Sequence, residues 1–140
     1  MPTTLLSFDY GTQSIGVAVG QAITQTASEL KPLKANDGVP NWNAVGELIQ
    51  QWQPDLLIIG LPLNMDGSES ELAARARKFA NRLNGRFHIK THLMDERLST
   101  YEAKEEAMAR RQTLDFKKNP VDSIAARLIL ESWFHEQSKQ

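Results

Sequence analysis

The chain has 140 residues, which fits a single domain over residues 1–140, because a typical domain has about 100 to 200 residues. Hydrophobic residues make up 41% and charged residues 24%, as in soluble globular proteins, and no apolar run approaches the roughly 20 residues that a membrane span needs. The net charge is -1. The absence of cysteine excludes disulfides, thiol catalysis and cysteine-bound metals.

The chain opens with predicted strands. Met1 to Leu6 lacks the basic start and apolar stretch of a secretory signal, so we expect a cytoplasmic protein. Thr4 to Tyr10 and Ser14 to Val19 are rich in β-forming residues, and the short gap between them has the length of a hairpin loop. A weaker run, Thr26 to Leu33, ends at a polar stretch that contains proline. Three consecutive short strands predict an antiparallel meander.

Helices and further strands alternate in the middle of the chain. Apolar residues at helical spacing predict a helix over Asn43 to Trp52. The solid apolar run Asp55 to Gly60 is typical of a central strand that is covered on both faces. A second helix is expected over Glu69 to Asn84, with Gly85 as its left-handed stop, and Phe87 to Met94 predicts another strand.

The end of the chain predicts two more helices. Ser99 to Arg111 is a polar helix with a capping box at its start, and the last helix begins at Pro120. Strands that are reached through helices run parallel to one another as a rule. The sequence therefore predicts an α/β fold: a five-stranded mixed sheet, its first three strands an antiparallel meander, with helices on both faces.

Positive charge gathers in the second half of the chain. Residues 75–118 hold 12 Lys and Arg against 6 Asp and Glu, whereas the remaining residues hold 4 against 11. Arg75, Lys78 and Arg82 form a stripe beside the apolar face of the second helix. One side of the molecule could therefore attract a polyanion, although solvated helix faces also produce such an imbalance.

The first candidate catalytic residue is an acid on the first strand. Asp9 shares a face with Leu5 and Ser7, where burying a carboxylate is costly unless it has a partner such as a metal ion. The alternative is that Asp9 simply begins the turn at Gly11, because Asp is common near Gly in turns.

Two further acidic positions lie at element boundaries. Asp95 and Glu96 stand where a strand ends and a helix begins, and one of these neighbours should face the sheet surface of Asp9. The alternative for them is a surface pair of Glu96 with Arg97, which contributes at most about 1 kcal/mol. Asp122 lies in the first turn of the last helix, where the helix dipole alone can explain it. Together the three carboxylates suit hard cations such as Mg²⁺.

Four segments resemble the signature segments of the YqgF/RuvX family. They are Phe8 to Thr12 with Ile15 to Ala18, Gly60 to Gly67, Asp95 to Thr100, and Val121 to Ala126. The resemblance runs from Leu5 to about Trp133. It implies an RNase H-like fold related to RuvC-type Holliday junction resolvases, with the sheet order 3-2-1-4-5. It also implies a nuclease that resolves Holliday junctions or matures the 5′ end of pre-16S ribosomal RNA, with ribosomal particles among its partners.

The resemblance places the family's acidic trio on Asp9, Glu96 and Asp122. Two Mg²⁺ ions, or Mn²⁺, about 3.5–4 Å apart would then be bridged by Asp9, activate a water and stabilise the leaving 3′ oxygen of a phosphodiester. Arg97 and the stripe Arg75, Lys78 and Arg82 would position phosphates without reading bases. Asp66 is an alternative carboxylate donor, although Asp-Gly is also typical of a turn.

Two other functions remain open from the sequence. Asp9 to Thr12, followed by Ser14, also resembles the first phosphate loop of the actin and sugar-kinase superfamily, which would make the chain an ATP-binding module. A noncatalytic RNA-binding ribosome-assembly factor could keep the same fold. The sequence decides neither between DNA and RNA as substrate nor the oligomeric state.

Overall fold

A computed structural model of the chain describes residues 3–95 and 122–138. Its elements are β1 (Thr4–Asp9), β2 (Ser14–Gln21), β3 (Thr26–Asn36), β4 (Val39–Pro40), α1 (Trp42–Trp52), β5 (Leu56–Leu61), α2 (Glu71–Phe87), β6 (Thr91–Asp95) and α4 (Asp122–Ser138). The predicted helix Ser99 to Arg111 and the Pro120 start of the last helix lie outside the described residues. In the described part of the chain, no helix is long and apolar enough to cross a membrane.

The strands form one mixed sheet in the order β4-β3-β2-β1-β5-β6. β1 pairs antiparallel with β2 and parallel with β5, and β5 pairs parallel with β6. The α/β class, the antiparallel start and the order of the five expected strands are confirmed. β1 is central because the meander lies on one side of it and the helix-linked strands on the other.

The prediction of five strands is wrong by one, because the short β4 pairs with β3 in a hairpin and adds a sixth strand. Asp37 and Gly38 form its two-residue turn with φ angles of 49° and 83°. Two positive φ angles are typical of the type I′ turn that matches the twist of paired strands. An Asp-Gly pair is the usual sequence for this turn, so the signal was present.

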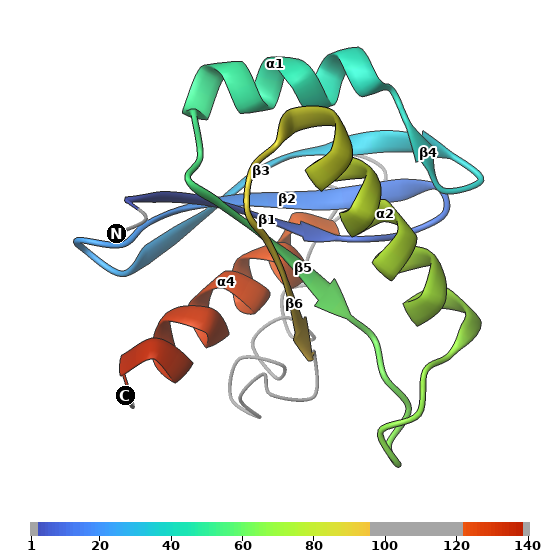
Figure 1. The fold of residues 1–140 in the computed structure, drawn as a ribbon. Helices are drawn as coiled ribbons and strands as arrows, with labels where there is room; N and C mark the ends of the chain where they lie inside the picture. The colour runs from blue at the N-terminus through green and yellow to red at the C-terminus, as the bar shows by residue number, and fades with distance from the viewer. Residues whose placement is uncertain (1–2, 96–121, 139–140) are drawn as a thin grey trace, which may run out of the picture.

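The sheet has a separate apolar core on each face (Figure 1). On one face α1 and α2 cover Leu6, Phe8, Leu57 and Ile59. On the other face α4 covers the alternate positions of the same strands. All six residues of β5 are buried, as its unbroken apolar run predicts, and each large side chain of this kind contributes about 1.5–3 kcal/mol on burial.

The second helix differs from its prediction at both ends. Ser70 caps its start by accepting a hydrogen bond from the backbone N–H of Ala73, so the helix begins at Glu71 and not at Glu69. Ala73 is buried at this end of the helix. Leu72 is 37% exposed. The helix also continues through Gly85, and the left-handed residue that ends it is His88, with φ 56°. Glycine favours a helix stop but does not require one when the following residues keep packing against the sheet.

Replacing Gly85 with Ala should stabilise the protein. Gly85 lies inside α2 with no heavy atom of the described chain near the position of an added Cβ, so alanine should raise the free energy of unfolding by about 0.5–1 kcal/mol. Urea denaturation followed by circular dichroism measures this change. Gly38→Ala is the opposite control, because the turn needs positive φ and an added Cβ would collide with the Tyr10 hydroxyl. A loss of stability in Gly85→Ala would contradict the helical assignment.

Candidate functional site

Asp9 ends the central strand and faces α4. Leu5, which shares its face of β1, belongs to the core under α4, and the hydroxyl of Ser7 donates a 2.6 Å hydrogen bond to the carbonyl oxygen of Ala126 in that helix. The strand alternates, so Asp9 continues this face at the carboxyl end of β1. It is half-buried there. The structure thus confirms the predicted face of Asp9 but leaves its predicted role untested.

The beginning of α4 lies at the same end of β1. The backbone N–H of Val17, which is opposite Phe8, donates to the Ser123 hydroxyl at 3.2 Å. At the other end, Gly20 is opposite Leu5 and lies against Leu130. α4 therefore runs antiparallel to β1.

This direction places the backbone of Asp122 close to the strand end that carries Asp9. Asp122 is the first residue of α4 and precedes Ser123, which is level with Phe8 through its contact with Val17. Two acids that are far apart in the sequence therefore belong to the same edge of the sheet. The Asp122 side chain is outside the described part of the structure.

The third acidic position lies next to β6. Met94 faces the α4 core and Leu93 faces the α1–α2 core, so the pleat turns Asp95 toward the face opposite to Asp9. Asp95 is therefore not the member of the Asp95–Glu96 pair that shares the face of Asp9. Glu96 and Arg97 lie outside the described residues, and their predicted roles stay predictions.

Asp66 is engaged in its own turn. One oxygen of its carboxylate accepts hydrogen bonds from the backbone N–H of Ser68 at 2.9 Å and from the Ser68 hydroxyl at 2.6 Å. These contacts favour the turn interpretation of Asp66 over a role as an alternative metal ligand. Over residues 3–95 and 122–138, no three acidic or histidine side chains come together as a metal site.

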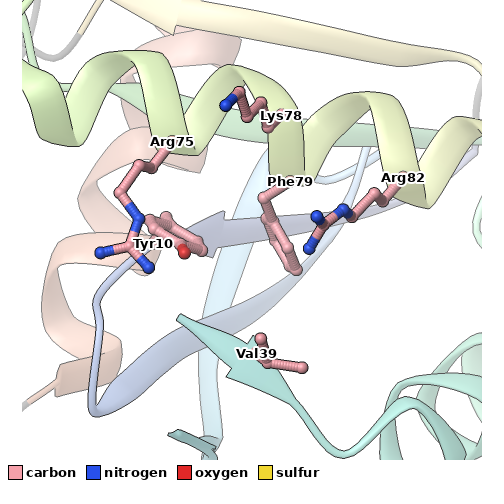
Figure 2. A pocket seen from close by; sticks show the side chains of 6 residues that line it. All are labelled: Tyr10, Val39, Arg75, Lys78, Phe79 and Arg82. Carbon is pink, nitrogen blue, oxygen red and sulfur yellow. The ribbon is translucent and has the colours of Figure 1, made fainter. Parts of the chain in front are cut away.

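The predicted basic stripe borders a hollow on the α2 side of the sheet. We call it the α2 hollow; it has a volume of about 200 Å³, and Figure 2 shows its lining. The lining residues are Tyr10, Val39, Arg75, Lys78, Phe79 and Arg82. The structure thus brings the three stripe cations together around one small space, on the face of the sheet opposite to Asp9.

Arg75 also has a structural contact that the sequence did not indicate. Its guanidinium donates to the backbone oxygen of Asp37 at 2.5 Å and lies 3.3 Å from the Asp37 carboxylate. The hydroxyl of Tyr10 donates to the carbonyl oxygen of Gly38 at 3.0 Å. Arg75 and Tyr10 therefore hold the β3–β4 turn beside the hollow.

One histidine near the site has a packing role. His92 on β6 lies edge-on to Trp133 of α4, with ring centroids 4.6 Å apart. Burial, and then the charge of Lys90, lower the pKa of His92 below its usual range. His92 is thus kept largely neutral at neutral pH, and one side of its exposed ring contacts Trp133.

Some residues around Asp9 and around the α2 hollow were not predicted from the sequence. Ser123 was quoted only as part of a motif, yet its buried hydroxyl joins α4 to two strands through Val17 and Leu30. Tyr10 and Phe79 had no predicted role beside the stripe. Their separation in the sequence is large, so only the packing of α2 on β1 brings them together.

A family model matches nearly the whole chain. The model described as "RuvX: Holliday junction resolvase" covers residues 3–136. A protein of Glaesserella parasuis serovar 5 named "Putative pre-16S rRNA nuclease" is 61% identical over 99% of this chain and 100% of its own length. A protein with the same name from Haemophilus ducreyi is 60% identical over 96% of this chain and 97% of its own length.

Solved structures share the fold at low sequence identity. Thermus thermophilus RuvC, solved in complex with a Holliday junction substrate, aligns with a TM-score of 0.64 and 14% identity over 99% of this chain and 97% of its own. The fowlpox virus resolvase, solved with Holliday junction DNA, aligns with a TM-score of 0.57 and 17% identity over 96% of this chain and 99% of its own. The predicted resolvase-like fold is confirmed.

Ser123→Ala should destabilise the protein. The substitution leaves the buried Val17 N–H without its acceptor and the Leu30 carbonyl without its donor, and we expect the free energy of unfolding to fall by about 1–3 kcal/mol. Urea denaturation checks the value. Ser138→Ala is the matched control in the same helix, because this serine is exposed and should change stability by less than about 0.5 kcal/mol. Equal effects of the two substitutions would show that Ser123 does not anchor α4.

Proposed function

The chain belongs to the RuvX family of Holliday junction resolvases, and we propose that it is a metal-dependent endonuclease that processes the 5′ end of pre-16S ribosomal RNA. The identity of about 60% to relatives named for that RNA, over nearly the full length of both chains, is the observation that carries this substrate. Holliday junction resolution is the second candidate, because the family model is described by that activity. Both substrates require hydrolysis of a phosphodiester bond in structured nucleic acid.

Asp9, Glu96 and Asp122 are the proposed metal ligands and catalytic residues. The alternation of β1 puts Asp9 on the α4 face, and the direction of α4 brings the backbone of Asp122 to the same strand end. The pleat of β6 removes Asp95 from this face, which supports Glu96 as the third ligand. Three carboxylates supply oxygen donors only, and oxygen is what Mg²⁺ and Mn²⁺ prefer. The donor set therefore fits a hard divalent cation.

The chain itself supplies a rigid support for this site. When bound, divalent cations lower the pKa of a water and stabilise charge on the phosphate oxygens. Asp9 ends a strand that is paired on both sides as far as Phe8, and it pairs with Gly16 itself, which fixes the backbone that carries its carboxylate. The buried hydroxyls of Ser7 and Ser123 fix the first turns of α4 against the sheet beside it.

The basic side chains are proposed to bind the nucleic acid backbone. Arg97 and the stripe of Arg75, Lys78 and Arg82 would contact phosphates, which positions the substrate without reading its sequence. Ribosomal particles are the natural setting for precursor rRNA, and we propose that the protein acts on them in the cytoplasm. The composition of the α2 hollow, with three cations and no acid in its lining, supports contact with phosphate groups.

Asp9→Asn should abolish cleavage while preserving the fold. Asparagine keeps the size of the side chain and removes the charge proposed to bind the cations, so the rate should fall by more than about 100-fold, since even outer partners of a metal site can cost that much. The measurement is Mg²⁺-dependent cleavage of precursor 16S rRNA and of a four-way DNA junction, side by side.

Asp66→Asn and Asp95→Asn are the matched controls for this test. Each removes one carboxylate near the same edge, but Asp66 is bound in its turn and Asp95 points to the other face of the sheet. Both should cleave at close to the parental rate. Parental activity in Asp9→Asn would refute the proposed site. A parent protein that cleaves nothing but binds ATP, with that binding lost in Asp9→Asn, would instead favour a nucleotide-binding module. A parent protein that binds RNA without cleaving it would favour a noncatalytic assembly factor.

Replacing Arg75, Lys78 and Arg82 together with Ala should weaken nucleic-acid binding. Each lost phosphate contact lowers the slope of log affinity against log salt by about 0.7 to 0.9, so three contacts should lower it by about 2 to 3. Fluorescence anisotropy titrations between low and high salt measure both quantities. Cleavage at saturating substrate should change little. An unaltered affinity and salt slope would show that the stripe is only a solvated helix face.

A further inference from the structure

The α2 hollow concentrates positive charge in a space of molecular size. Arg75, Lys78 and Arg82 come from successive turns of α2. Figure 2 shows the guanidinium groups of Arg75 and Arg82 beside the rings of Tyr10 and Phe79, with Lys78 lying along the helix between them. A protein that only follows a duplex spreads its cations along an open surface. The three cations instead border a single hollow of about 200 Å³, the size of one small group.

Two of these cations have no counter-charge in the described part of the chain. Arg75 is paired with Asp37, which is itself 85% exposed. Lys78 and Arg82 make no ion pair or hydrogen bond with any residue that the structure describes, and the lining of the hollow contains no acid. The hollow therefore offers about two unbalanced positive charges.

The apolar floor of the hollow is too deeply buried to bind a base by stacking. Tyr10 is only 7% exposed and Phe79 only 3%, because their rings pack against each other at a centroid distance of 5.2 Å. The Tyr10 hydroxyl is already used on the carbonyl oxygen of Gly38. Base recognition needs an accessible ring face or free polar groups. The hollow therefore suits a charged group rather than a nucleobase.

We propose that the α2 hollow binds the terminal phosphate monoester of a nucleic acid strand. A phosphate monoester carries a charge of about -1.5 to -2 and three acceptor oxygens, which matches the two unbalanced cations, whereas an internal diester carries a single charge. This inference rests on the proposed nuclease function and adds the kind of strand that the enzyme selects. Lys78 and Arg82 are the residues that hold the phosphate, and Arg75 shapes the rim through the β3–β4 turn.

The position of the hollow relates the phosphorylated end of the nucleic acid to the proposed cleavage site at Asp9. Tyr10 follows Asp9 directly, with adjacent Cα atoms about 3.8 Å apart, and their side chains point to opposite faces of the sheet. A strand that passes around the carboxyl end of β1 would place its terminal phosphate in the hollow and an internal bond beside Asp9. The enzyme would then favour bonds that lie a few nucleotides from a phosphorylated end.

The test compares RNAs of equal length and sequence that differ only in the chemical group at their ends. Three fluorescent single-stranded RNAs carry a 5′-phosphate, a 3′-phosphate or hydroxyls at both ends, and their dissociation constants are measured by anisotropy without divalent metal, so that no cleavage occurs. One phosphorylated RNA should bind about tenfold or more tightly than the hydroxyl-ended RNA, since hydrogen bonds between charged groups are strong. Which of the two binds tightly identifies the end.

The double variant Lys78→Gln with Arg82→Gln should lose this preference. Lys31→Gln with Lys90→Gln is the matched control, because it removes the same charge from exposed positions outside the hollow and should keep the preference. Equal binding of the three RNAs by the parent protein, or an unchanged preference in the double variant, overturns the proposal. Competition by adenosine 5′-monophosphate as strong as by the phosphorylated RNA also overturns it, because the ligand would then be a free nucleotide.

A parallel Mg²⁺ cleavage assay separates this proposal from the nuclease function. Parent protein that cleaves an internal bond but shows no preference among the three RNAs would leave the nuclease function standing and refute the phosphate site. Parent protein that shows the preference, and loses it in the double variant, without cleaving any substrate would support the phosphate site and refute the nuclease function.

Discussion

The packing of α4 across the central strands is the constraint on which the proposed site at Asp9 depends. The buried hydroxyl of Ser7 on β1 binds the backbone of α4, and the buried hydroxyl of Ser123 on α4 binds the backbone of β2 and β3. Each hydroxyl would be costly to bury without these partners. They set how far α4 can slide along β1 and which residue of the helix stands at the strand end. The position of Asp122 relative to Asp9 therefore follows from hydrogen bonds made by Ser7 and Ser123.

The covered sheet divides the proposed work between its two faces. The face under α4 carries Asp9, with the backbone of Asp122 at the same strand end, and the face under α2 carries the basic hollow. Acids and cations in one open cleft would neutralise each other by forming ion pairs. The sheet between them keeps the charges of opposite sign available for different parts of one substrate, a cation-binding centre and a phosphate chain.

Much of the fold could be predicted from local patterns, and the site only in part. The strand β5 is buried on both faces and therefore has an unbroken apolar run. The helix α1 is buried on one face only and therefore has apolar residues at helical spacing. The end of α2 could not be predicted from Gly85, since packing carries the helix to Phe87. The face on which Asp9 lies could be predicted from strand alternation, whereas its catalytic role is a proposal that rests on the family resemblance. The hollow depends on the contact of Tyr10 with Phe79, which no local pattern contains.

The short β4 has a consequence for how molecules of this protein meet one another. A sheet edge with free N–H and C=O groups can pair with the edge of another molecule and begin aggregation. β4 has only two residues, and its second, Pro40, has no N–H to donate to a further strand. The chain then turns directly into α1, which starts at Trp42. This end of the sheet edge thus stops growing at a proline, but β4 pairs only with Ala35 and Asn36 of β3. Along the rest of β3, Pro32 has no N–H and Lys31 and Lys34 are exposed, and both features discourage pairing with the edge of another molecule.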